Sequence, residues 1–205
     1  MLNLVLRLTG LLWGLLMVVL AVLLAGGNGR LPAQRAQIDY PGFDGCALPC
    51  WAGVTPSQTA TGHAPQVMAS HLAQTQLEFR TVVTQINFEA TGPDAQFNGV
   101  IYDDRGVVGG LRFEVDVPLW KLLDALDTPA CIRSHPGADG REVVTVSWET
   151  QNNVVSGTII VPTWRSWRPS ARVSLLGVFT RYPACAAPGE RPWHGFAPLW
   201  RYRGG

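Results

Sequence analysis

The sequence predicts an α+β protein with an N-terminal transmembrane helix followed by two helix-plus-antiparallel-sheet units. Three observations support this fold class. Residues 8–29 contain no charged side chain. The spacing of apolar residues changes from helical to alternating after Phe79. A helical segment followed by strand-like segments occurs twice along the chain.

These patterns divide the chain into four segments. Residues 1–29 are the membrane anchor or signal, and residues 30–45 are a linker of small, polar and proline residues without periodicity. Residues 46–129 form the first helix-plus-sheet unit, which includes a second helix at residues 118–126. Residues 130–205 form the second antiparallel sheet unit and a tail rich in Trp and Arg.

The N-terminal segment has the length and composition of a membrane span. A helix rises about 1.5 Å per residue, so roughly 20 apolar residues cross a hydrocarbon core, and residues 11–25 are almost purely aliphatic. A cleaved signal peptide is the alternative, because residues 25–27 (Ala-Gly-Gly) offer small side chains for cleavage. The apolar run exceeds the roughly 7–15 residues of a signal, so we favour a retained anchor and a membrane-anchored localisation.

The four cysteines predict disulfides and an extracytoplasmic setting, because an even number behind an export segment is typical of oxidised domains. Four cysteines allow three pairings. We favour Cys46 with Cys50 and Cys131 with Cys185, since the latter two flank the second sheet unit, and a crossed pairing is the alternative. A thiol-redox role is less favoured, because three residues rather than two separate Cys46 from Cys50.

The helices of the first unit follow from helix-start signals and apolar spacing. Pro56 and the neighbouring Ser and Thr residues predict a helix start, and residues 64–79 carry apolar side chains at roughly helical spacing. Pro118 sits well in the first turn of the second helix, at residues 118–126. Each helix is expected to lie across one face of an antiparallel sheet.

The strands are predicted from alternation and β-branched content. Residues 81–88 alternate between apolar and polar, as a strand with one buried face does. Residues 97–102 and 107–117 predict a hairpin that turns at residues 103–106, and Gly109-Gly110 indicates a bulge or a close backbone approach. Residues 142–148, 154–161 and 172–179 are further antiparallel strands.

Two short motifs resemble known families. Residues 51–59 (Trp-Ala-Gly-Val-Thr-Pro-Ser-Gln-Thr) resemble the helix start of the small outer-membrane assembly lipoproteins with the BamE/SmpA-like fold, a unit that tandem β-lactamase inhibitor proteins use twice. Residues 127–132 resemble the helix exit of these families. The chain has no lipobox, and Pro56-Ser57 stands where the family pattern has Pro-Gly.

A further resemblance spans residues 46–202. Residues 46–54 (Cys-x-x-Pro-Cys-Trp-x-Gly-Val) are similar to the opening of a family of uncharacterised, membrane-anchored bacterial proteins. Members of that family close on a Trp-x-Gly-Phe element, which corresponds to residues 193–196. These resemblances imply a fold, an extracytoplasmic setting and binding rather than catalysis, and they name no ligand.

Several function classes lack their sequence signals. The net charge of +1 gives no overall attraction to nucleic acid. The chain has no Gly-x-Ser-x-Gly nucleophile motif and no phosphate-binding glycine loop, and its four histidines stand at no metal-ligand spacing. We therefore expect no enzymatic activity, no cofactor, no metal and no nucleic-acid partner.

Tryptophan and arginine residues of a loop and of the tail are the candidate binding surface. These two residue types form cation–π pairs and are enriched at interface hot spots. Internal packing of the loop at the sheet edge is the alternative. The candidate residues are Trp164, Arg165, Trp167, Arg168, Trp193 and Arg201.

The predicted function is a non-catalytic, membrane-anchored binding or scaffold domain outside the cytoplasm. Its partners are expected to be the membrane, through the N-terminal helix, and a protein of the bacterial cell envelope. The alternative is a sensor of a small ligand or glycan that stacks on the aromatic side chains.

Overall fold

The computed structural model describes residues 38–93, 96–137, 139–162, 167–180 and 185–202, together with Trp13, Leu16 and Met17. The chain forms two compact units, residues 1–36 and residues 37–205. The three described residues of the first unit are helical and exposed. The second unit holds every strand and helix discussed below.

The predicted transmembrane helix is contradicted. No helix in the described part of the chain is long and apolar enough to cross a membrane. The two α-helices of the second unit, α2 (Ala64–His71) and α3 (Leu119–Leu126), have eight residues each, which span only about 12 Å. This finding corrects the predicted membrane-anchored localisation. All of residues 1–29 except Trp13, Leu16 and Met17 lie outside the described residues.

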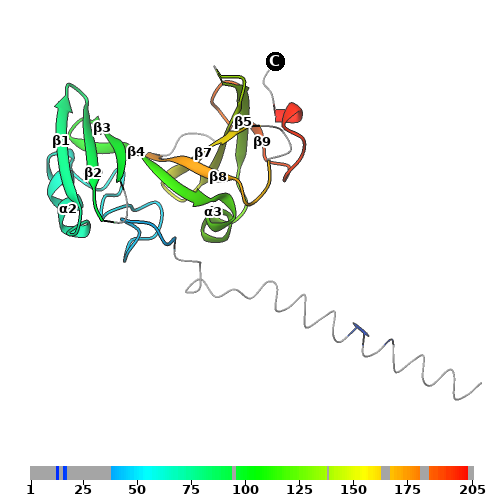
Figure 1. The fold of residues 1–205 in the computed structure, drawn as a ribbon, viewed down its shortest axis with the longest axis horizontal. Helices are drawn as coiled ribbons and strands as arrows, with labels where there is room; N and C mark the ends of the chain where they lie inside the picture. The colour runs from blue at the N-terminus through cyan, green and yellow to red at the C-terminus, as the bar shows by residue number, and fades with distance from the viewer. Residues whose placement is uncertain are drawn as a thin grey trace, which may run out of the picture. The chain divides into compact units, whose positions relative to one another are not determined.

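One antiparallel sheet forms the framework of the second unit (Figure 1). The described strands follow the order β1-β2-β3-β4-β8-β7-β6-β5-β9 across this sheet. Their bounds are β1 (Gln76–Val82), β2 (Gln85–Thr91), β3 (Gln96–Asp104), β4 (Val107–Pro118), β5 (Cys131–Pro136), β6 (Glu142–Glu149), β7 (Asn153–Val161), β8 (Arg172–Thr180) and β9 (Arg191–Pro192).

The predicted α+β fold of two helix-plus-sheet units is wrong. Strand β4 pairs with β8 from Gly110↔Phe179 to Pro118↔Arg172, so the strands of both expected units belong to one sheet. The apolar alternation of β4 continues to Val117, so the strand is long enough to pair with β3 along one edge and with β8 along the other. The described part of the chain is therefore mostly strand, with short helices at the surface of the sheet.

The first helix is shorter than predicted. It begins with a 3₁₀ turn, η2 (Thr61–His63), and α2 ends before Leu72. Residues 76–82 form β1 instead, because Leu77 and Phe79 alternate with charged neighbours and pack against the core. The expected strand at 81–88 is a hairpin that turns at residues 83 and 84.

Other predicted elements are confirmed. Strands β3 and β4 form the expected hairpin, and the register shifts beside Gly109 as expected for a bulge. Helix α3 follows Pro118, and β6, β7 and β8 lie where the later strands were predicted. Strands β5 and β9 and the C-terminal 3₁₀ turn η4 (Leu199–Tyr202) were not anticipated.

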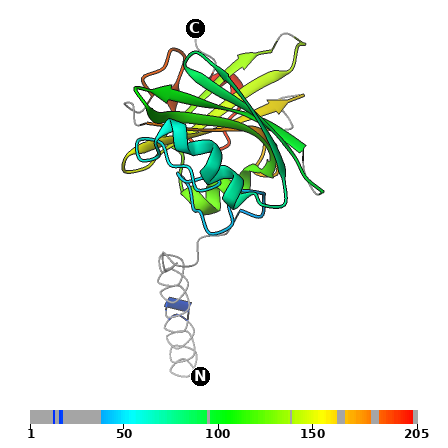
Figure 2. The same cartoon turned by 90° about the vertical axis from the view of Figure 1, so that its left-hand side faces the viewer.

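One face of the sheet is covered along both halves. Over β1–β4, the cover consists of residues 38–60 and α2, and Figure 2 shows α2 across the outer side of these strands. Over β5–β8, it includes α3, whose Leu122 lies 3.4 Å from the position that a Cβ on Gly157 would take. Ile38 and Phe43 are buried here and belong to the core, whereas Asp39, Asp44 and Gly45 between and after them are exposed.

Trp51 is the centre of the core over β1–β4. Its side chain is 1% exposed and stacks on Phe113 with ring centroids 4.0 Å apart and an interplanar angle of 17°. The rings of Phe88 and Phe97 lie 5.6 and 5.8 Å away, and the indole N–H donates to the Pro41 carbonyl over 3.0 Å. The indole is therefore packed on several sides and its polar atom is satisfied.

Two disulfides close loops of very different length. Cys46 pairs with Cys50 directly before Trp51, and Cys131 pairs with Cys185, which ties the C-terminal segment to β5. Sequence reasoning favoured the same pairing. The two bonds span sequence separations of 4 and 54 residues.

Removal of the disulfide that closes the longer loop is expected to cause the larger loss of stability. We expect Cys131→Ser with Cys185→Ser to lower the free energy of unfolding by about 4 kcal/mol, and Cys46→Ser with Cys50→Ser by about 2 kcal/mol, from the entropy of loop closure. Denaturant unfolding of the two double variants measures the difference. Equal losses would contradict the loop-length argument.

Replacement of the central indole predicts a large loss of stability. We expect Trp51→Ala to lower the free energy of unfolding by about 3–5 kcal/mol, because it leaves a cavity against Phe113. The matched control is Trp200→Ala, since Trp200 is 66% exposed and its loss is expected to stay within about 0.5 kcal/mol. Similar losses in both variants would show that Trp51 is not the core anchor.

Candidate functional site

The face of the sheet opposite the core carries polar and aromatic side chains, and we call it the open face. Strand alternation places these side chains there, since their neighbours in sequence point into the core. Figure 1 shows the sheet bending where β4 and β8 pass between its two halves. The open face comprises Glu78, Arg80, Asn87, Glu89, Asn98, Val100, Tyr102, Arg112, Glu114, Ser156, Thr158, Leu175 and Phe179.

A hollow of about 380 Å³ lies on this face over β1, β2, β3, β4 and β8. Its lining includes three glutamates and two arginines, so charges of both signs meet there. The lining residues are Glu78, Arg80, Asn87, Phe88, Glu89, Asn98, Gly99, Val100, Arg112, Glu114 and Leu175. A hollow shared by five strands indicates that the open face is concave in this region.

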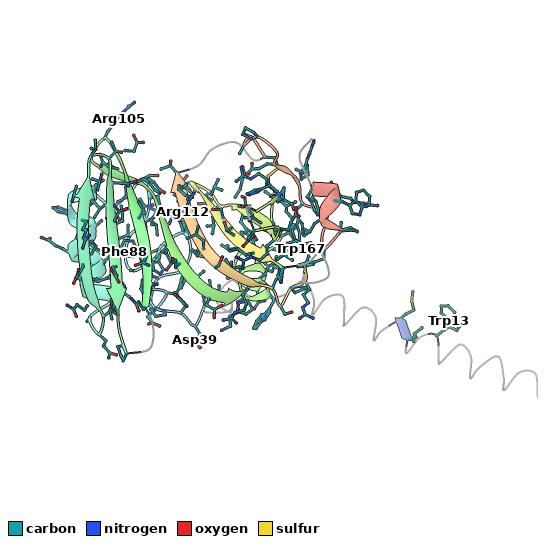
Figure 3. The ribbon with its side chains drawn as sticks, turned by 45° about the horizontal axis from the view of Figure 1, so that its top comes forward. Trp13, Asp39, Phe88, Arg105, Arg112 and Trp167 are labelled. Atoms are coloured by element: carbon teal, nitrogen blue, oxygen red, sulfur yellow. A yellow bond between two sulfur atoms is a disulfide. The ribbon has the colours of Figure 1, made fainter. Side chains whose placement is uncertain are left out.

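Phe179 lies flat on the sheet where the two halves meet. A Cβ on Gly110 would come within 2.4 Å of the Phe179 ring, and a Cβ on Gly177 within 2.5 Å. Only glycine at both positions leaves the ring its place. Tyr102 lies beside it with ring centroids 6.0 Å apart, and the Arg112 guanidinium lies 5.9 Å from the ring centroid. Figure 3 shows Arg112 between the two halves of the sheet.

The carboxylate of Glu114 is held in place beside this cluster. The backbone N–H and the side-chain amide of Asn98 both donate to Glu114 Oε2, over 3.2 and 3.3 Å. Glu89 accepts from the Gln96 amide over 3.3 Å. Two of the three carboxylates of the hollow are therefore held by hydrogen bonds from neighbouring amide groups.

The open face changes character over β6 and β7. Thr145 lies opposite Thr158, and Ser147 lies opposite Ser156, so neutral hydroxyl groups form successive rungs. These rungs of β6 and β7 therefore contrast with the charged and aromatic side chains of the open face over β1–β4 and β8.

An arginine bridges the bulge between β4 and β8. The pairing shifts register between Glu114 and Val117, and there Arg172 Nε donates to Asp116 Oδ1 over 2.6 Å while Nη2 donates to the Asp116 carbonyl over 2.5 Å. The hydrogen bond from Arg172 lowers the pKa of the Asp116 carboxyl. Arg172 thus donates to the Asp116 carbonyl, which the bulge leaves without a partner in the strand ladder, and to the Asp116 carboxylate.

Tyr40 stays protonated beside these acids. Burial raises the pKa of its hydroxyl, and the charges of Asp116 and Glu114 raise it further. The hydroxyl donates to the Glu114 carbonyl over 3.2 Å. This contact links the N-terminal loop to the strand that carries Arg112.

The predicted Trp/Arg surface is only partly described. Trp164 and Arg165 lie outside the described residues. Trp167 is 7% exposed and contacts Trp193 and Phe196 with ring centroids 5.9 and 5.1 Å apart, so it packs inward.

The remaining candidate residues lie at the surface or in disulfides. Arg168 is exposed, and the Arg201 guanidinium lies 5.4 Å from the Trp200 ring. Cys46 and Cys131 are buried within their disulfides. No group of three or more His, Cys, Asp or Glu side chains that could hold a metal occurs among the described residues.

Sequence reasoning missed the cluster of Tyr102, Arg112 and Phe179. The only signal was Gly109-Gly110, which predicted a bulge or a close backbone approach. Both occur, because Gly109 sits at the bulge and Gly110 lies under the Phe179 ring. The partner glycine, Gly177, is on a strand far along the chain, so the pattern alone did not connect the two.

Comparison with known proteins finds no matching family model, no matching curated protein and no matching solved structure. The resemblances proposed from the short motifs stay predictions.

The Asp116–Arg172 pair predicts a small pH dependence of stability. Because the folded pKa of Asp116 is lowered, the pair stabilises above the pKa of an unfolded aspartate, and this contribution is lost as the pH falls through the folded pKa. Both side chains are exposed, so the contribution is at most about 1 kcal/mol.

Carboxyl titration by NMR tests this assignment. We expect Arg172→Ala to raise the pKa of Asp116 towards its ordinary value, whereas Arg105→Ala, in an exposed turn, leaves it unchanged. An unchanged Asp116 pKa in Arg172→Ala would show that the Arg172 guanidinium does not cause the lowered pKa.

Proposed function

We propose that residues 37–205 form a non-catalytic binding domain that works outside the cytoplasm and recognises a protein partner through the open face. The single observation that carries this proposal is the cluster of Tyr102, Arg112 and Phe179 at the centre of that face. Tyrosine and arginine are enriched at interface hot spots, and aromatic anchors supply contact area there. The two disulfides favour an oxidising compartment.

The arrangement around the cluster favours a protein over a small molecule. The hollow beside it is charged and open, and two of its carboxylates are held by hydrogen bonds from Asn98 and Gln96. Sites for small ligands enclose most of the surface of their ligand. Charged groups of both signs around an aromatic centre suit the rim and core of a protein interface.

A small ligand or glycan is the second candidate, on one observation. The volume of the hollow, about 380 Å³, falls within the range of about 300–1,000 Å³ that is usual for ligand pockets. Amide and carboxylate groups beside aromatic rings also suit sugar hydroxyls.

Site-specific photocrosslinking in the producing cells tests the proposal. A benzophenone amino acid at Tyr102 is expected to give one discrete protein adduct, and Arg112→Glu is expected to abolish it. The same crosslinker at Trp120, which is exposed on α3, is the control and should give no such adduct. Identical adducts from both positions, or none from Tyr102, would contradict a protein-binding open face.

The affinity for the captured partner measures how much Phe179 contributes to binding. We expect Phe179→Ala to weaken binding by roughly 10- to 30-fold, the usual loss for an aromatic hot spot, while its melting temperature shows that the domain stays folded. A folded variant that binds unchanged would remove Phe179 from the interface. A rise in melting temperature with oligosaccharide alone would favour the glycan candidate instead.

A further inference from the structure

Strand β1 is a bare edge of the sheet. It lies at the end of the strand order and pairs only with β2, and Figure 1 shows it at the outer end of the sheet. Within the described residues, no backbone hydrogen bond reaches its other side. A bare edge of this kind is a template for pairing with another strand.

The hairpin geometry determines which backbone groups point outward. The loop between β1 and β2 has two residues, Val83 and Thr84, and is closed by the pair Val82↔Gln85. The closing pair of such a hairpin exchanges two hydrogen bonds, and bonded pairs then alternate along the strands. The N–H and C=O groups of Leu77, Phe79 and Thr81 therefore face the bare edge.

The side chains on this edge are complementary to themselves. If two copies of β1 pair in antiparallel with Phe79 opposite Phe79 of the second copy, Leu77 lies opposite Thr81. Glu78 then lies opposite Arg80, and this opposite-charge pair occurs twice by symmetry. These are the pairs without direct hydrogen bonds, in which side chains approach most closely.

Other registers lose this match. A two-fold axis at Glu78 or Arg80 would also bond the outward backbone groups, but it would bring like charges face to face. An axis at Leu77 or Thr81 leaves neither charge opposite its counterpart. Only the axis at Phe79 satisfies both the outward backbone groups and the two charges.

The charged side chains of β1, Glu78 and Arg80, form no salt bridge with the other described residues. Glu78 lies directly opposite Glu89 of β2, and like charges in this position destabilise a sheet. Arg80 of a second copy would supply the missing positive charge.

We infer that a second copy of this chain pairs with β1 in antiparallel, in the register that is centred on Phe79. The two sheets then continue into each other, and the two hollows of the open faces lie on either side of the junction. Val82, which is 49% exposed, is covered by Gln76 of the second copy. This inference is independent of the proposed partner of the open face.

Charge-reversal variants of the full chain test the register. Sedimentation over a range of concentrations is expected to show a dimer for the wild type. Glu78→Arg and Arg80→Glu each place like charges opposite each other twice, so each is expected to weaken the dimer by about tenfold or more. Glu149→Arg, at an exposed position on β6 and far from β1 in the strand order, is the matched control and should dimerise as the wild type does.

Combining the two substitutions, in one chain or in a mixture, distinguishes an effect on the pairing register from a general loss of stability. The double variant E78R/R80E restores both opposite-charge pairs, and an equimolar mixture of the two single variants forms a heterodimer, which energy transfer between labelled copies detects. A monomeric wild type, single variants that dimerise unchanged, or a mixture that stays monomeric would each overturn the inference. Melting temperatures confirm that every variant is folded.

Discussion

The stack of Trp51 on Phe113 joins the N-terminal loop to the strand that runs through the middle of the sheet. That strand, β4, pairs with β3 along one edge and with β8 along the other. Because side chains alternate along a strand, a fixed Phe113 also fixes Arg112 and Glu114 on the opposite face. The stack in the core and the side chains of the open face therefore depend on the same backbone, that of β4. The Cys46–Cys50 loop lies directly before Trp51 and so adjoins this stack.

Glycines rather than large residues shape the centre of the open face. Gly110 on β4 and Gly177 on β8 remove side chains from two adjacent strands, and Phe179 fills the space with its ring against the backbone. The ring is therefore held by the sheet itself, which reduces the entropy that a partner must remove on binding. Arg112 and Tyr102 then lie beside a rigid surface.

The sequence predicted local elements better than their assembly. Alternation located β3, β4 and β6 to β8, and Pro118 located α3, because these signals depend on neighbouring residues alone. The pairing of β4 with β8 joins Phe113 to Leu176, which lie far apart in sequence, and no local pattern encodes it. Phe79 was assigned to a helix because its apolar spacing fits both periods over a short window.

The two edge regions of the sheet differ in how far other segments cover them, and this difference determines which assembly can form. At one end, β9 pairs with Cys131 and Ile132 of β5, and the Cys131–Cys185 disulfide fixes the C-terminal segment beside that edge. At the other end, no other described strand pairs with the outer edge of β1. A sheet with one covered edge can add a second copy only once, through an isologous contact, and such a contact closes on itself. The isologous contact uses up the β1 edge, and β9 with the disulfide covers the Cys131–Ile132 part of the opposite edge, so growth stops at a pair.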